Sequence, residues 1–372
     1  MKKVLLPLLL LPSLLAFSQM QRLLIGTYTN TNSTGIYQYD FNSGTGKADL
    51  VDSMKTTNPS FLATARHGKF IYSVNEEGKA QGSGKVSAFA VSASGHLSLL
   101  NQQSSGGEHP CYIAVDKTEH WIAVGNYTTG TVSVLQIKED GSLGEAATTI
   151  QHRGSSVNKA RQSSPHVHAT VFSPDNKYLL VSDLGTDKLM VYSFNVKTGN
   201  LLPLNAFSFA KLPDGTGPRH LAFHPNSKWV YLVGELTGTV TLMDYKKGVL
   251  QPSHQTISLL PKDYKGAATA ADIHVSADGR FLYASNRNTS NNIAIFSINQ
   301  KSGILKPIGH QSTLGRAPRN FNFDPSGNFL LVANQDTDNV VVFRVNRQTG
   351  LLTDTGHRIA VPRPVCVQWL VK

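Results

Sequence analysis

Four ionisable side chains are the strongest candidates for chemistry in this sequence. They are His168, Arg219, Glu235 and Arg287. A guanidinium presents a rigid fork of donors that suits a carboxylate, a phosphate or an oxyanion formed during a reaction. A histidine can act as acid or base, and a glutamate whose pKa is raised by burial can act as a general base on water. This combination fits a reaction in which negative charge develops on oxygen.

The candidates occupy a repeat with a period of roughly fifty residues, and such periods are typical of closed or stacked arrays of small sheets. Each copy contains a short alternating apolar segment, a polar turn, a continuous apolar run, and two further segments joined by a turn such as Thr-Gly. Clear copies begin at His109, Ser164, Gly217, Ala270 and Ala317, and a weaker one begins at Asn58. Four antiparallel strands repeated in this way are typical of propeller blades. No long segment has a helical period, so the sequence predicts an all-β fold.

The two ends of the chain complete the blade count. A first strand begins at Pro364 with nothing after it, whereas the chain near Arg22 begins with a second strand, followed by a third from Gly35. Joined, these segments make one complete blade beside the six internal ones. We therefore expect a seven-bladed β-propeller with four antiparallel strands per blade, closed by N- and C-terminal strands that share one blade.

Counting from the turns of the repeat places the candidates around one mouth of the central channel. Arg219 falls at the position of His168 and Arg319, and Glu235 and Arg287 occupy equivalent positions at the ends of their second strands. Further polar residues lie at or next to these positions, and we expect them to bind the substrate. They are His166, His220, Asn126, Asn334 and Arg319. The sequence leaves open whether His166 or His168 is the working imidazole, because both lie on the same strand face. It also allows a purely structural role for each residue, such as an ion pair for Glu235.

The first residues have the pattern of a secretory signal peptide. Met1-Lys2-Lys3 precedes an apolar run that ends near Ala16, and small residues favour cleavage just before Gln19. We therefore expect a signal peptide over residues 1–18, a propeller over residues 19–372, and export to the periplasm or beyond. The apolar run is too short for a membrane span, and no other long run exists.

Composition bounds the partners. The formal charge of +11 is dispersed, without basic runs, which argues against nucleic acid and fits a small anionic substrate. Cys111 and Cys366 fall on first strands of blades separated by another blade, so a disulfide would have to cross the channel. Both are read as small core residues. No zinc-binding spacing occurs, and we expect no metal and no cofactor. We also expect a monomer.

Several phrases together resemble one known family. "SPHVHATVFSPDNKYLLVSDLGTDKLMVYSF", "GPRHLAFHPNSKWVYLVGEL", "YASNR" and "LLVANQDTDNVVVF" are similar to the lactonase family of seven-bladed propellers, which includes propeller-type 6-phosphogluconolactonase and carboxy-muconate lactonizing enzyme. The resemblance extends from Ile25 to the final strand. It implies metal-independent chemistry on the cyclic ester of an organic acid, with His168, Arg219, Glu235 and Arg287 as the active-site set.

The resemblance leads to the expectation that the protein hydrolyses the lactone of a sugar acid. The arginines would hold an acidic group and polarise the ring carbonyl, while Glu235 or His168 activates water. Export argues against the cytosolic 6-phosphogluconolactone as the substrate. Two alternatives remain at this point, a lactonizing (cycloisomerase) relative and a non-catalytic binding propeller of the cell envelope.

Overall fold

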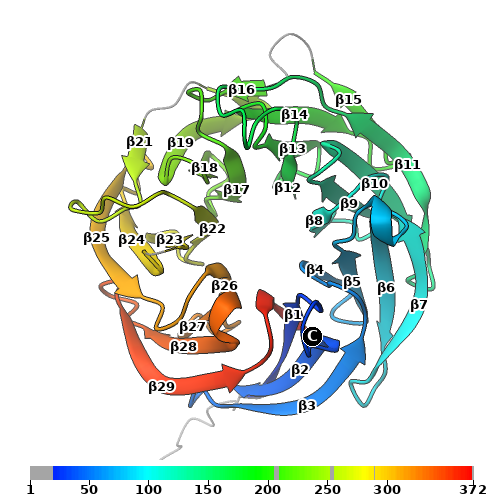
Figure 1. Ribbon diagram of the computed structural model, residues 1–372, viewed down its shortest axis with the longest axis horizontal. Coiled ribbons are helices and arrows are strands. Elements are labelled where there is room, and N and C mark those ends of the chain that lie inside the picture. The colour runs from blue at the N-terminus through cyan, green and yellow to red at the C-terminus, as the bar shows by residue number, and fades with distance from the viewer. Residues whose placement is uncertain (1–19, 205–208, 252–254, 289, 371–372) are drawn as a thin grey trace, which may run out of the picture.

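A computed structural model describes residues 20–204, 209–251, 255–288 and 290–370. Its strands form seven sheets arranged in a ring around a central channel (Figure 1), as the repeat predicted. Within the described ranges, regular helix is limited to two short 3₁₀ turns, η1 (Lys79–Gln81) and η2 (Gln335–Thr337). No helix in these ranges has the length and apolar character needed to cross a membrane. The predicted signal peptide, including its cleavage point, lies outside the described residues.

Each blade contributes one strand to each of four concentric positions. The innermost strands are β4 (Leu62–Ala65), β8 (Pro110–Val115), β12 (Val167–Phe172), β17 (Pro218–Phe223), β22 (Ala270–Val275), β26 (Pro318–Phe323) and β30 (Pro364–Leu370). The second strands are β1 (Met20–Thr27), β5 (Phe70–Asn75), β9 (Trp121–Asn126), β13 (Tyr178–Asp183), β18 (Trp229–Gly234), β23 (Phe281–Asn286) and β27 (Phe329–Asn334).

The third strands are β2 (Gly35–Asn42), β6 (Lys85–Val91), β10 (Thr131–Ile137), β14 (Lys188–Phe194), β19 (Thr239–Lys246), β24 (Asn292–Ile298) and β28 (Asn339–Val345). The outer strands are β3 (Ala48–Lys55), β7 (Leu97–Ser104), β11 (Leu143–Gln151), β25 (Leu305–Ser312) and β29 (Leu352–Ala360). In two blades the outer position is divided between two short strands, β15 (Leu201–Pro203) with β16 (Phe209–Lys211), and β20 (Val249–Leu250) with β21 (Gln255–Ser258). The expected four-stranded plan therefore holds with this local division.

Ring closure follows the prediction. β30 pairs antiparallel with β1, from Arg22 opposite Leu370 to Thr27 opposite Pro364. The resulting sheet has the order β3-β2-β1-β30, so its innermost strand comes from the end of the chain and its other three strands come from the beginning.

The hydrophobic core lies between neighbouring blades. The second strands are buried along almost their whole length because they lie between two strands of their own sheet and face a sheet on each side. Trp229 and Tyr231 of β18, for example, pack in one cluster with Leu282 and Ala284 of β23 in the next blade. This explains why the second segment of each repeat is continuously apolar and the outer segment is not.

In six of the seven blades, the glycine in the turn between the third and fourth strands packs against an aromatic residue of the preceding blade. At Gly350, an added Cβ would lie 2.4 Å from the ring of Phe281, and φ is +76°. The pairs of this kind are Gly46 with Phe329, Gly141 with Phe70, Gly199 with Trp121, Gly248 with Tyr178, Gly303 with Trp229, and Gly350 with Phe281. Both the close contact and the left-handed backbone favour glycine at this turn. The recurring glycine of the repeat therefore allows close packing between neighbouring blades.

Candidate active site

A β-bulge at the start of the inner strands determines which side chains enter the channel. In β17, Pro218 pairs with Gly234 and Leu221 pairs with Leu232. Between these two pairs, the inner strand contains one residue more than β18. The same register shift occurs in β8, β12, β22 and β26. A bulge of this kind re-aims the side chains beside it.

Because of the bulge, the side chains of two successive residues of one strand both point into the channel, at different depths. Arg219 reaches the carboxylate of Glu235, which directly follows β18 at the mouth where the inner strands begin. His220 instead contacts the rings of Phe61 and Tyr112 across the channel, with ring centroids 5.8 and 5.1 Å away. Simple strand alternation would have turned one of the two residues away from the channel.

Glu235 is the centre of the cluster at this mouth. Its Oε2 lies 3.0 Å from Nε of Arg219 and 3.0 Å from Nη2 of Arg287, and its Oε1 lies 2.6 Å from Nη2 of Arg161. Burial alone would raise the pKa of this carboxyl, but Arg287, Arg219 and Arg161 outweigh burial and lower the pKa to about 2. The expectation of a raised pKa for Glu235 is therefore wrong, and the low pKa makes this carboxylate a weak proton acceptor. The carboxylate stays ionised and holds three guanidinium groups in place.

Two of these arginines are also fixed by backbone carbonyls. Arg219 is 1 % exposed and its Nη1 donates to the carbonyl of Ala271 at 2.5 Å. Arg287 donates from Nε to the carbonyl of Thr269 at 3.1 Å and from Nη2 to that of Ala270 at 3.3 Å. Burial, with the nearby Arg287 and Arg319, lowers the pKa of Arg219 to about 10. Arg219 therefore remains cationic at neutral pH.

Arg161 is a member of the cluster that the sequence did not reveal. It lies in the segment between β11 and β12, and its Nη2 also donates to the hydroxyl of Tyr127 at 3.2 Å. Asp187 anchors this segment, because its Oδ1 accepts a hydrogen bond from Nε2 of Gln162 at 2.8 Å and another from the backbone N–H of Gly217 at 2.7 Å. The same carboxylate thus ties the segment that bears Arg161 to the turn that bears Arg219. The one available signal was that the interval between adjacent repeats is longest here.

His168 lies beside the guanidinium cluster as a neutral imidazole. It is 4 % exposed, and its ring packs edge-on to Tyr127 and His220, with centroids 5.5 and 5.4 Å away. Its Nδ1 lies 3.7 Å from Sγ of Cys111. Burial, followed by the charges of Arg219, His220 and Arg319, lowers the pKa of His168 well below its usual value. The imidazole therefore keeps a lone pair that can accept a proton.

His166 occupies the rim outside His168. Its ring stacks on Tyr127 with centroids 4.4 Å apart, and its Nδ1 lies 2.8 Å from the backbone carbonyl of Tyr127. Asp183 accepts the backbone N–H of His166 at 2.8 Å. Both histidines therefore contact one tyrosine, as their shared strand face suggested, but only His168 is enclosed.

Arg319 forms a second group at the same mouth. Its guanidinium lies over the ring of Tyr28, 5.4 Å from the centroid, and 4.0 Å from Oε2 of Glu76. The hydroxyl of Tyr28 donates to the same Glu76 oxygen at 2.9 Å. Burial opposes the charge of Arg319, but Tyr28 and Glu76 outweigh burial and raise its pKa. Tyr28 and Glu76 were not anticipated, because neither position stood out from its repeat copy.

Three residues expected to bind substrate lie elsewhere. Asn126 and Asn334 are fully buried, and each side-chain amide bonds a backbone carbonyl and a third-strand side chain of its own blade. Their position next to Glu235 in the repeat therefore does not bring them into the cluster, because their side chains point into the sheet. His220 lies below the mouth, as described above. The two cysteines are free and buried.

The mouth is thus rich in positive charge. Within the two arginine clusters, Arg161, Arg219, Arg287 and Arg319 are paired with Glu76 and Glu235, which leaves an excess of two positive charges in these clusters. Within the described ranges, no group of three or more His, Cys, Asp or Glu residues is placed to hold a metal ion. The arrangement can bind an anionic group, stabilise a developing oxyanion and accept a proton at His168.

Comparison with known proteins identifies the family of this chain. A family described as "Lactonase, 7-bladed beta-propeller" matches residues 22–369. A 6-phosphogluconolactonase of Bacillus subtilis is 38 % identical over 351 residues, covering 93 % of this chain and 97 % of that protein. One of Formosa agariphila is 39 % identical over 317 residues, covering 84 % of this chain and 88 % of its own.

Solved structures are equally similar. A putative 6-phosphogluconolactonase from Bacteroides fragilis has a TM-score of 0.89 at 40 % identity, covering 95 % of this chain and 98 % of its own. The periplasmic gluconolactonase PpgL of Pseudomonas aeruginosa has a TM-score of 0.89 at 34 % identity, covering 94 % and 99 %. On these matches, the chain belongs to the lactonase family of seven-bladed β-propellers.

Proposed function

We propose that this protein is a lactonase that hydrolyses the lactone of a sugar acid at the mouth that contains Glu235. The observation that carries the proposal is the pairing of one ionised carboxylate with three guanidinium groups beside a neutral, enclosed imidazole. The names of the related 6-phosphogluconolactonases and of the periplasmic gluconolactonase support the same substrate class.

Each group has a distinct part in the proposed reaction. A guanidinium donates to the lactone carbonyl oxygen, and His168 takes a proton from water as the water oxygen bonds to the carbonyl carbon. The tetrahedral oxyanion is stabilised by the arginines. Its collapse breaks the ring C–O bond, and the leaving oxygen takes up the proton from His168, so the product is the open hydroxy acid. Glu235 does not exchange protons in this scheme, because it is needed as the anion that positions Arg161, Arg219 and Arg287.

The excess positive charge favours a substrate with an anionic group. A phosphorylated and an unphosphorylated glucono-lactone differ by such a group, so comparing their kcat/KM measures its contribution. Hydrolysis of either one, followed with a pH indicator, supports the proposal. Silence with both and with other sugar lactones would favour the non-catalytic binding alternative.

The site assignment is tested by substitution. Arg219→Ala or Glu235→Ala is expected to abolish lactone hydrolysis with an unchanged circular dichroism spectrum. Arg358→Ala, on the outer strand β29, is the matched control and is expected to retain activity. Full activity in both site variants would remove the assignment.

We further propose that the protein is exported after removal of residues 1–18 and acts as a monomer without a cofactor. The name of the periplasmic relative supports export. N-terminal sequencing of protein secreted from its native cell would begin at Gln19. Recovery of the full-length chain in the cytosol would contradict export and would restore the phosphorylated intermediate as the leading substrate.

A further inference from the structure

Below the mouth lies a cavity of about 370 Å³, here called the channel cavity. Its lining comes from the middle and C-terminal parts of the inner strands, including Thr64 and Val115. It therefore extends toward the end of the channel opposite Glu235. At ~30 Å³ for each water, this volume holds about a dozen waters, and it lies at the small end of the ~300–1,000 Å³ range of ligand pockets.

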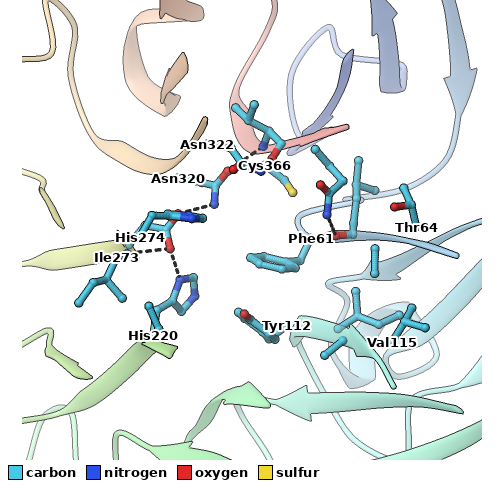
Figure 2. A pocket seen from close by; sticks show the side chains of 18 of the residues that line it. Phe61, Thr64, Tyr112, Val115, His220, Ile273, His274, Asn320, Asn322 and Cys366 are labelled. Carbon is cyan, nitrogen blue, oxygen red and sulfur yellow. Dashed lines mark hydrogen bonds and ion pairs between the residues drawn. The ribbon is translucent and has the colours of Figure 1, made fainter. Parts of the chain in front are cut away.

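One wall of the channel cavity is a polar network centred on Asp272 (Figure 2). Asp272 Oδ1 lies 2.7 Å from Nδ1 of His220, and Oδ2 lies 3.1 Å from Nε2 of His274 and 2.5 Å from Nδ2 of Asn320. Backbone N–H groups of Ile273 and Phe321 also donate to this carboxylate. Burial would raise the pKa of Asp272, but the two histidines outweigh it and hold the pKa well below its usual value. The carboxylate is therefore ionised and fully hydrogen-bonded.

The network leaves one buried atom of His220 without a partner. Because Nδ1 of His220 donates to the ionised Asp272, the other ring nitrogen, Nε2, carries the lone pair. Nothing among the described residues donates a hydrogen bond to Nε2, and the residue is 4 % exposed. Burial, with the charge of Arg219, lowers the pKa of His220 to about 4, so the ring stays neutral at neutral pH. A buried acceptor without a donor is costly, which points to an O–H or N–H group that occupies this place.

The opposite wall is apolar and carries an aromatic platform. The rings of Phe61 and Tyr112 stack with centroids 4.2 Å apart and an interplanar angle of 28°, and both contact His220 edge-on. Ala63 and Ala114 also line the cavity. In Figure 2 the two rings lie beside His220 and face the side that carries His274 and Asn320. An aromatic face opposite planar hydrogen-bonding groups suits a ring with apolar C–H faces and hydroxyl edges.

The charge of the channel cavity disfavours anionic ligands, such as a phosphorylated lactone. Its described lining contains no Lys, Arg or Glu, and its one carboxylate is enclosed by donors. An anionic ligand would find no cation here and would face Asp272. The lining therefore fits an uncharged, hydroxylated ligand.

We propose that the channel cavity is a second binding site, separate from the mouth at Glu235, for a small uncharged hydroxylated ring such as a pyranose. A ligand hydroxyl donates to Nε2 of His220, and a C–H face of the ring lies against Phe61 and Tyr112. The proposal does not depend on the proposed lactonase activity.

The test is a titration of the whole protein with D-glucose, observed through the ring-nitrogen NMR signals of His220. The signals are assigned by their loss in His220→Gln. D-glucose is expected to shift the Nε2 signal in a saturable manner, because that nitrogen gains a hydrogen bond. Absence of any shift would mean that water alone fills the cavity and would overturn the proposal. An equal shift with D-gluconate would overturn the assignment to uncharged ligands.

Two substitutions locate the site without removing a hydrogen-bonding group from the Asp272 network. Ala114→Phe fills the cavity and is expected to abolish D-glucose binding, whereas Ala146→Phe adds the same bulk to the exposed outer strand β11 and is expected to leave binding unchanged. Tyr112→Ala is expected to weaken binding up to about tenfold, since aromatic contacts are worth ~0.5–1.5 kcal/mol. Unchanged binding in Ala114→Phe would place the ligand elsewhere and contradict the proposal.

The two proposals fail separately. Arg219→Ala removes a guanidinium from the mouth and is expected to retain D-glucose binding. Loss of lactone hydrolysis with intact D-glucose binding therefore bears only on the mouth. Intact hydrolysis in a wild-type protein that does not bind D-glucose bears only on the channel cavity.

Discussion

The two ends of the channel are built from successive residues of the same strands but have opposite electrostatic character. At the mouth, Glu235 is surrounded by three guanidinium groups, of which those of Arg161 and Arg287 remain partly exposed. In the channel cavity, Asp272 is surrounded by imidazole and amide groups and carries no arginine partner. Both carboxylates are ionised and buried, yet the first is outnumbered by guanidinium groups, whereas the second is enclosed by imidazole, amide and backbone donors.

The bulge explains how one short sequence motif supplies side chains to both ends of the channel. In the phrase "PRH", Arg219 serves the mouth and His220 serves the cavity, and in "PRN" Arg319 and Asn320 divide in the same way. Two functions can therefore change independently by substitution of adjacent residues. Four predictions can break or sharpen this contrast.

The largest effect is expected at the proposed base. His168→Gln removes the proton acceptor but keeps a similar shape, so kcat for lactone hydrolysis should fall about 10²–10⁴-fold with a small change in KM. Stopped-flow or indicator kinetics measure both constants. A rise in KM alone, with kcat intact, would assign His168 to substrate binding and leave the mouth without its base.

The next-largest effect is expected at Arg161, which lies outside the repeat. Arg161→Ala removes a charge-assisted hydrogen bond, worth ~1.5–3 kcal/mol, so kcat/KM should fall about 10- to 150-fold. Arg153 lies on the same segment and is exposed, so Arg153→Ala provides the matched control. Equal activity of the two variants would show that the segment between β11 and β12 only covers the site.

The pH profile should distinguish His168 from an ordinary histidine. Its pKa is lowered by burial and by Arg219, His220 and Arg319, so the neutral, active form persists as the pH falls through 6.5. kcat/KM should therefore stay level down to about pH 5.5, where a histidine of pKa ~6.5 would already have lost about tenfold. An inflection near pH 6.5 would contradict the neutral enclosed imidazole.

The smallest effect is expected from ionic strength, which should change ligand binding at the mouth but not in the channel cavity. Raising the ionic strength screens the excess positive charge at the mouth, so KM for a phosphorylated lactone should rise a few-fold. D-glucose binding in the channel cavity should not respond, because D-glucose carries no charge that salt could screen. A parallel response at both ends would erase the electrostatic contrast.

The sequence predicted the blades well because strand periodicity and turn residues are local properties repeated along the chain. It also predicted that Arg219, Glu235 and Arg287 converge, because equivalent positions in a ring must meet at one mouth. It did not predict Arg161, which comes from a segment outside the repeat. The pKa of Glu235 was also out of reach, since its sign depends on guanidinium groups from separate segments.

The channel cavity was only partly accessible to prediction. Asp272 occupies the repeat position of His220 and could have been found by the same alignment. Its partnership with His220 could not, because the bulge that turns both side chains inward leaves no periodic signal in the sequence.

Closure of the ring by β30 has a consequence for how the chain acquires its structure. Residues near position 22 pair with residues near position 370, which are translated after the strands of the six other blades, so the two partners are far apart in the sequence. High contact order slows folding, and the six other blades can assemble on the ribosome before this step. The final step of folding is therefore expected to be the docking of a single strand, and a nascent chain stalled before Pro364 would present β1 to chaperones as an incomplete sheet.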